Sequence, residues 1–228
     1  IAERLHRHGV ATGAVIGNGN AGSAFGMGRG FDYYADTVGH WKGLPSADDV
    51  VDLALPFVRE NVNEPFFLML FTVDAHDPYH APEPYENMFV DKPDVKLIRS
   101  PHWELGRYSD DEIERMKATY DGALRYTDDV LGRFFGELKK MGVYDKATII
   151  VTADHGEAFG EHGYFLHAHH LYDEIIRAPL IVRAPKMSAR GVYSHYLFQS
   201  LDLAPTIASH FGLNSARIWP GVDIFELQ

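Results

Sequence analysis

Apolar runs of strand length recur along this chain and alternate with helical patterns. Four of them read VATGAVI (10–16), FFLMLFTV (66–73), ATIIVTA (147–153) and APLIVRA (178–184). Each run is too continuously apolar to leave one face in water, so we expect strands that are buried on both sides. Strands that alternate with helices form parallel sheets with crossover helices. The pattern therefore predicts an α/β fold, with a mostly parallel sheet sandwiched by helices.

Helix boundaries are also legible in the sequence. Ser46 and Ser109 each stand three residues before an acidic side chain, a spacing typical of a helix N-terminus. The helix after Ser109 is long, and Gly142 indicates where it ends, because glycine is favoured just past a helix C-terminus. A further helix is expected from about residue 202 to 210. Residues 75–108 hold five prolines and little periodicity, which predicts a long irregular excursion over one edge of the sheet.

Size, charge and cysteine content limit the classes of function. A chain of 228 residues with 46% hydrophobic composition can bury one core, so we expect a single α/β domain over 1–228. The formal charge of −11 argues against nucleic acid as a partner, because non-specific binding to phosphates needs a basic face. No apolar run approaches the roughly 18 residues of a membrane span. Since the chain has no cysteine, any metal site must use oxygen and imidazole ligands.

Polar, ligand-type residues follow two of the expected strands. One strand leads into DAHDPYH (74–80) and another leads into DHGE (154–157). In open α/β sheets, ligands bind in the crevice outside the carboxyl ends of the strands. We therefore expect one shared site formed by Asp74, His76, Asp77, Asp154 and His155. A structural reading stays open, in which Asp154 caps the turn after its strand and His155 is a hydrogen-bonded loop histidine.

The second of these polar segments is unusually rich in histidine. TADHGEAFGEHGYFLHAHH (152–170) contains five of the thirteen histidines of the chain. The pair Asp154 and His155 can bind a hard or borderline divalent cation through a carboxylate oxygen and a ring nitrogen. Two ligands are too few, so the others must come from elsewhere. For the histidines in the following glycine-containing loop, a solvated surface position is the simpler reading.

Five segments resemble, in order and spacing, the sulfatase branch of the alkaline phosphatase superfamily. They are GRGFDYYAD (28–36), PFFLMLFTVDAHDPYHAP (65–82), TADHGEAFGEHGYF (152–165), LYDEIIRAPLIVRAP (171–185) and SLDLAPTIASHFG (200–212). The resemblance covers most of the chain, and it implies the α/β fold of that superfamily. It also implies that Asp154 and His155 are metal ligands, with histidine where many calcium-dependent sulfatases have asparagine. His76 would contact the ester and protonate the leaving oxygen.

The residue that contacts the anionic oxygens of the substrate, called here the oxyanion contact, does not follow from a single matching position. In the family, the segment before LYDE supplies a lysine or histidine to the sulfate or phosphate group. Aligning Tyr172 with the family's tyrosine puts Ala168 in the usual lysine position. The neighbouring His167 is therefore expected to make this contact, with His169 as the alternative. Asp77 and His169 are the expected substrate-binding residues.

The family's nucleophile is not found in this sequence. It normally sits in a Cys-x-Pro-x-Arg or Ser-x-Pro-x-Arg element, upstream of a helix like the one that follows Ile1, and a paired-aspartate metal segment lies earlier still. Ser100 and Pro101 are the nearest look-alike, and they lack the arginine. The family's C-terminal antiparallel subdomain is not found either. We therefore expect an internal portion of a sulfatase-like protein, without the N-terminal strand and nucleophile region, that is inactive alone.

Two classes of function follow from the resemblance. The first is a metal-dependent hydrolase of sulfate esters that acts on a small anionic ester, or of phosphate or phosphonate esters within the same superfamily. One divalent cation is expected, calcium or manganese, because the family's other ligands are carboxylates. Formylglycine could form from a cysteine or serine in the upstream element. The second class is a non-catalytic metal-binding or interaction module. The sequence leaves compartment and oligomeric state open.

Overall fold

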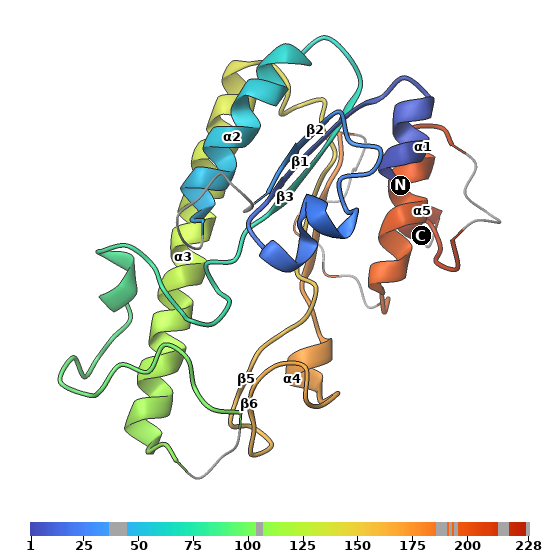
Figure 1. Ribbon diagram of the computed structural model, residues 1–228. Coiled ribbons are helices and arrows are strands. Elements are labelled where there is room, and N and C mark those ends of the chain that lie inside the picture. The colour runs from blue at the N-terminus through green and yellow to red at the C-terminus, as the bar shows by residue number, and fades with distance from the viewer. Residues whose placement is uncertain are drawn as a thin grey trace.

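A three-stranded parallel sheet forms the centre of the protein (Figure 1). The computed structural model describes residues 1–36, 45–103, 107–185, 191, 193, 196–213 and 219–226. Strand β1 (Ala11–Ile16) lies between β2 (Tyr33–Ala35) and β3 (Phe66–Phe71), and both pairings are parallel. All of β1 except Ala11 is buried. The α/β prediction is therefore confirmed, and β1 is the strand that is buried on both sides.

Helices cover both faces of this sheet (Figure 1). One face carries α2 (Ala47–Glu60) and α3 (Asp110–Lys140). The other face carries α1 (Ala2–Arg7) and α5 (Leu203–His210), which pack around a small cluster that includes Leu5. Single turns of 3-10 helix lie at Gly19–Ala21, Ser23–Phe25, Tyr85–Asn87, Ser200–Asp202 and Ile224–Glu226.

The long helices begin where the sequence predicts. In each capping box, the serine hydroxyl accepts a backbone N–H three residues later, and the acidic side chain accepts the serine's own N–H. For Ser46 the two distances to Asp49 are 3.3 and 2.8 Å. For Ser109 the two distances to Glu112 are 3.4 and 2.9 Å. Gly142 follows the end of α3 with φ of +70°, as expected of a glycine past a helix C-terminus.

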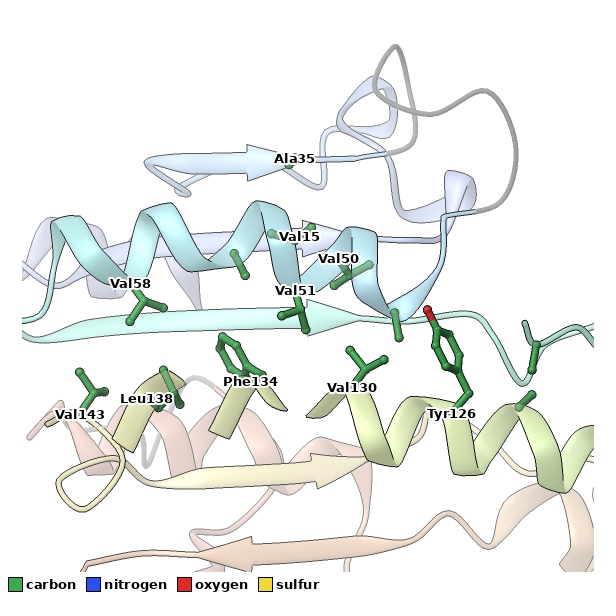
Figure 2. Packing of buried hydrophobic residues seen from close by; sticks show 14 residues of the cluster. Val15, Ala35, Val50, Val51, Val58, Tyr126, Val130, Phe134, Leu138 and Val143 are labelled. Atoms are coloured by element: carbon green, nitrogen blue, oxygen red, sulfur yellow. The ribbon is translucent and has the colours of Figure 1, made fainter. Parts of the chain in front are cut away.

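The main hydrophobic core fills the space between α2, α3 and the sheet (Figure 2). Its fully or nearly fully buried members include Val15, Val50, Val51, Val58, Val130, Phe134 and Leu138. Burying side chains of this kind contributes about 1.5 to 3 kcal/mol each, so this layer is the main source of stability for the sheet. It fixes β3, and with it the segment that follows β3, against α3.

Two further long strands pair in the opposite sense to the parallel strands of the central sheet, and three of the four predicted strands are less buried than expected. β4 (Ile149–Thr152) pairs with β7 (Leu180–Arg183), and this pairing is antiparallel. β3, β4 and β7 are only partly buried, and Ile181 on β7 is 64% exposed. The expectation that all four apolar runs are buried on both sides is therefore wrong for three of them. In the part of the chain that is described, β3 and β4 each have a hydrogen-bonded neighbour on one side only.

The segment between β3 and α3 has one regular element in its described residues, the 3-10 turn Tyr85–Asn87. It packs along α3, where Arg115 donates hydrogen bonds to Asn87 and to the backbone oxygen of Lys92. Gly122 of α3 lies so close to the backbone oxygen of Tyr85 that a side chain at this position would collide with it. None of the described helices has the length and apolarity that crossing a bilayer requires.

Candidate active site

Three histidines from distant parts of the sequence meet in one cluster. His76 follows β3, His155 follows β4, and His167 follows the hairpin of β5 (Ala158–Phe159) and β6 (Phe165–Leu166). The ring centroids of His155 and His167 are 4.1 Å apart, and those of His76 and His167 are 5.0 Å apart. The structure thus brings together the rings of three of the seven residues that the sequence analysis assigned to the site.

The backbone on either side of His167 is strained. Leu166 and Ala168 have φ angles of +66° and +73°, in the left-handed region that residues with a side chain rarely adopt. Such a conformation costs about 1 to 3 kcal/mol per residue and persists only where its surroundings enforce it. Phe165, which is buried in the cluster with Tyr79, Met116 and Phe159, anchors the loop on its N-terminal side. Strain of this kind is common at functional sites, and here it determines how His167 is presented.

A buried carboxyl group holds the other side of the His167 ring. Both side-chain oxygens of Glu157 lie 3.3 Å from Nδ1 of His167, and the Glu157 side chain is only 5% exposed. Burial raises the pKa of Glu157 to about 8, and the nearby Asp77 carboxylate acts in the same direction. Burial also lowers the pKa of His167, with His155 and His76 adding to the effect. Both shifts favour the neutral forms, so this contact is a hydrogen bond between neutral groups rather than an ion pair.

This arrangement has a chemical consequence for His167. A protonated Glu157 donates its proton to Nδ1 in a hydrogen bond, and Nε2 then carries the ring hydrogen. An N–H donor at Nε2 is the form that can contact an anionic oxygen. Sequence reasoning missed Glu157, although it is the last residue of the DHGE segment (154–157). Its role depends on burial against His167, which no local pattern encodes.

Backbone carbonyl groups orient the other two rings. Nδ1 of His76 lies 2.6 Å from the backbone oxygen of Asp77, and Nδ1 of His155 lies 2.8 Å from the backbone oxygen of Gly156. Each Nδ1 must therefore carry a hydrogen, which leaves Nε2 of a neutral ring as a lone-pair donor. Nε2 of His155 is thus suited to a metal ion, with the backbone contact supporting the ring. His76 can deliver a proton from Nε2 only as the imidazolium.

Asp154 and His155 have the geometry of two ligands of one cation. The carboxylate Oδ1 of Asp154 lies 3.7 Å from Nε2 of His155, and the Asp154 side chain is 59% exposed. Metal–ligand bonds of about 2.0 to 2.6 Å place two ligands of one ion roughly 3 to 5 Å apart. The pair therefore fits part of a divalent-cation site. Among the described residues, no group of three or more potential ligands is assembled.

Three further residues from the two polar segments, Asp74, His162 and His169, have their main contacts outside the cluster of His76, His155 and His167. Among the described residues, no hydrogen bond or ion pair joins Asp74 to the three histidines. Asp74 is 9% exposed, and its Oδ1 accepts a hydrogen bond from the backbone of Ala47 at the start of α2. His162 pairs with Glu174 at 2.7 Å, so it has a local structural partner. His169 packs against the ring of Trp103, with centroids 5.1 Å apart. Asp74 was expected in the shared site because it follows β3, and that expectation is not supported.

A pocket of about 380 Å³ adjoins the cluster. It begins at His155 and His167 and continues along the loop that leads to α4 (Asp173–Ile176). Its lining residues are His155, His167, Ala168, His169, His170, Leu171 and Ile175. The expected oxyanion contact and the expected alternative, His169, therefore line one pocket together with a metal-ligand candidate.

The curated relatives of this chain include two bacterial proteins, one named as a member of the alkaline phosphatase superfamily and one named as a sulfatase. It is 29% identical to the multifunctional alkaline phosphatase superfamily protein PehA of Trinickia caryophylli, over 74% of this chain and 38% of that protein. It is 28% identical to N-acetylglucosamine-6-O-sulfatase of Bacteroides thetaiotaomicron, over 71% of this chain and 28% of that protein. The chain thus spans well under half the length of these two relatives.

Solved structures share the fold. The phosphonate monoester hydrolase of Agrobacterium radiobacter superposes with a TM-score of 0.76 at 18% identity, covering 99% of this chain and 60% of that one. A protein solved with its substrate D-glucosamine-2-N,6-O-disulfate has a TM-score of 0.70 at 18% identity, covering 99% of this chain and 63% of that one. The family profile described as Sulfatase matches residues 1–213. The five matching segments, the fold and this profile agree, and the chain belongs to the sulfatase family.

Proposed function

We propose that these residues form the larger part of the active site of a metal-dependent hydrolase of sulfate esters. The observation that carries this proposal is the convergence of His76, His155 and His167, with Asp154 beside them, in a chain of the sulfatase family. Hydrolysis of such an ester needs a donor to the anionic oxygens, an acid for the leaving oxygen and a nucleophile. The cluster offers candidates for the first two.

His167 is the proposed donor to the anionic oxygens of the substrate. Its Nδ1 is engaged by Glu157, which leaves Nε2–H as the ring donor that can make that contact. A preorganised donor of this kind is typically worth about 10² to 10³ in rate, because charge on these oxygens grows in the transition state. The strained backbone at Leu166 and Ala168 fixes the ring in place before the substrate arrives.

His76 is the proposed acid for the leaving group. Its Nδ1 is occupied by the backbone oxygen of Asp77, so a proton leaves from Nε2. Its ring centroid lies 5.0 Å from that of His167, which supports the proposal that both side chains act on one ester. Asp77, whose side chain lies 3.4 Å from Nδ1 of His76, is the proposed second substrate-side group.

Asp154 and His155 are the proposed ligands of one divalent cation, and calcium or manganese suits a carboxylate-rich site. Held by these two side chains, such a cation would neutralise charge on the oxygens of the ester and of the nucleophile. These 228 residues contain no cysteine and no Ser-x-Pro-x-Arg element. We therefore propose that the nucleophile, a formylglycine where a sulfate ester is the substrate, is not among them.

Phosphate or phosphonate esters are the second candidate substrates. The relative PehA is named a multifunctional protein of the alkaline phosphatase superfamily, which supports testing more than one ester class. A non-catalytic module that only binds metal is the remaining alternative.

The test compares aryl sulfate, aryl phosphate and aryl phosphonate monoesters on protein that contains these residues together with the nucleophile element. We expect turnover of the sulfate ester with calcium or manganese present, and its loss after chelation. Asp154→Ala should remove both bound metal and turnover. The exposed Asp173→Ala, on α4, is the matched control and should retain both. Metal binding without hydrolysis of any ester would instead favour the non-catalytic module.

A further inference from the structure

The short helix α4 packs against the segment that carries His155, the proposed metal ligand. The backbone N–H of Gly156 donates a hydrogen bond of 2.6 Å to the backbone oxygen of Ile175 in α4. A side chain at Gly156 would collide with the backbone oxygen of Glu174, so the close approach of the two backbones requires glycine here. The oxygen of Gly156 in turn accepts the hydrogen bond from Nδ1 of His155. The position of α4 therefore affects the direction of the His155 ring.

A side-chain pair joins α4 to the tip of the β5–β6 hairpin, which lies next to α4 in Figure 1. Nδ1 of His162 lies 2.7 Å from Oε1 of Glu174. The His162 ring also stacks on Tyr172, the residue before α4, with centroids 3.9 Å apart and an interplanar angle of 8°. The Glu174 side chain is only 15% exposed, and a carboxylate so far removed from water needs a partner. His162 supplies that partner, and the hairpin tip is thereby held against α4.

The hairpin acts on His155 from two sides. Its C-terminal end leads into His167, whose ring centroid lies 4.1 Å from that of His155. Its tip contacts α4 through His162 and Glu174, and α4 holds Gly156. The hairpin therefore constrains His155 twice, once at the ring and once through the backbone that follows it.

A positioning role and a purely structural role for the His162–Glu174 pair lead to different expectations. The His162 side chain is 48% exposed, and such a pair contributes little to the free energy of unfolding because water screens the charges. Removing a side chain that orients a metal ligand typically weakens metal binding about 10- to 100-fold. Loss of a positioning pair should therefore weaken metal binding much more than it weakens the fold.

We propose that Glu174 is a positioning residue for His155 and that His162 holds Glu174 in place. This proposal rests on the proposed function, in which His155 is a ligand of one divalent cation. Glu174 acts through α4 and Gly156, which fix the carbonyl group that accepts the hydrogen bond from the His155 ring. Nε2 of His155 is thereby aimed at the metal position before a cation binds.

Nitrogen-15 NMR of the histidine rings tests this proposal without metal or substrate. The protein contains these residues together with the nucleophile element, and spectra are recorded at about pH 8, where ordinary histidines are neutral. The signal that disappears in His155→Gln belongs to His155. We expect its ring hydrogen on Nδ1 in the unaltered protein and in Glu174→Gln, whose amide oxygen still accepts a hydrogen bond from His162. In Glu174→Ala the two tautomers of His155 should be mixed, and a single Nδ1–H tautomer there would overturn the proposal.

Calcium and manganese binding, measured by calorimetry on the same proteins, is the second readout. Glu174→Ala and His162→Ala should each weaken binding about tenfold or more, whereas Glu174→Gln should stay within about twofold of the unaltered protein. The matched control is Asp173→Ala, which removes the neighbouring carboxylate of α4, an exposed group paired with Arg177. This control should leave the metal affinity unchanged.

The variants at Glu174 also separate positioning from charge and from stability. Equal losses of metal affinity in Glu174→Gln and Glu174→Ala would show that the charge of Glu174 acts on the metal, and they would contradict positioning through the hydrogen bond. Urea unfolding of Glu174→Ala should show a smaller fold-change in the folding equilibrium than in metal affinity; equal fold-changes would assign the pair to the fold alone. If the unaltered protein binds neither cation, the proposed function fails, while the tautomer of His155 still decides this proposal.

Discussion

At the scale of single residues, His167 is the side chain whose position the structure specifies most strongly. Two left-handed residues flank it, a buried carboxyl group contacts Nδ1, and two histidine rings pack against it. Each of these features costs free energy or removes freedom, and none of them is needed for a surface loop. They are consistent with a ring that must be in place before an anionic ester binds.

Replacing this ring tests its proposed role. We expect His167→Ala to lower kcat for the sulfate ester about 10²- to 10³-fold, because the contact to the developing charge is lost. Binding of the metal should be retained, since its proposed ligands are Asp154 and His155. His8→Ala, at an exposed histidine after α1, is the matched control. A variant at His167 with unchanged kcat would remove this residue from the proposed mechanism.

A second residue-scale prediction concerns Asp74. Burial raises its pKa to about 6, its Oδ1 is paired with Ala47, and its Oδ2 has no hydrogen-bond partner among the described residues. Because the folded-state pKa lies above the ordinary value of 3.8 for an aspartate, the folded state binds this proton more tightly than the unfolded state does. The stability that the bound proton gives is full below about pH 4 and is lost as the pH rises through about 6.

Asp74→Asn should remove this dependence. The stability of the variant relative to the original protein should increase between about pH 4 and 7, by on the order of 2 kcal/mol, and then level off. Urea unfolding at several pH values measures the difference. Asp52→Asn, at an exposed position of α2, is the matched control. A difference at Asp74 that stays constant across this range would contradict the assignment of a buried, proton-binding carboxyl group.

At the scale of elements, substituting two glycines of α3 tests how this helix packs against the irregular segment between β3 and α3. Gly122→Ala would push its Cβ into the backbone oxygen of Tyr85, so α3 and the 3-10 turn must separate. We expect a loss of about 1 to 3 kcal/mol in the free energy of unfolding. Gly132→Ala meets nothing within 4 Å and should stabilise α3 by about 0.5 to 1 kcal/mol. Chemical denaturation of both variants measures these changes, and shifts of the same sign would contradict the packing.

The elements also show which signals a single sequence carries. The capping boxes at Ser46 and Ser109 were predictable because both partners lie within one turn. The direction of β7 was not, because an apolar run specifies neither its neighbour nor the sense of pairing. The burial of β3, β4 and β7 was overestimated for the same reason. Apolar runs indicate that strands form, whereas the layers that cover them depend on the whole assembly.

In the site, too, the positions that follow from local sequence could be predicted, whereas those that depend on tertiary packing could not. The rule that ligands gather at the carboxyl ends of strands placed His76 near His155, and the structure brings both rings to His167. The same rule predicted Asp74 in this site, and its Oδ1 accepts a hydrogen bond from Ala47 at the start of α2. Glu157 was missed because its burial results from packing between the β5–β6 hairpin and the segment after β3. The roles of the remaining site residues stay predictions.

At the scale of the whole molecule, the described elements bring together the proposed acid His76, the proposed oxyanion donor His167 and the proposed metal ligand His155 in a protein of the sulfatase family. The family profile covers residues 1–213, while the two curated relatives compared above are much longer than this chain. A covalent mechanism requires a nucleophile beside the metal, and these residues contain no element of the expected kind. The central claim is therefore that this cluster acts on an ester only together with that element.

Turnover of aryl sulfate and aryl phosphate, measured side by side on two polypeptides, tests this claim most directly. One is the 228-residue chain alone; the other contains the same residues together with the Cys-x-Pro-x-Arg or Ser-x-Pro-x-Arg element. We predict no significant hydrolysis by the first, and hydrolysis of at least one ester by the second that is lost on His76→Ala. Turnover by the 228-residue chain itself, lost on His76→Ala, would contradict the claim, because the nucleophile would then lie within these residues.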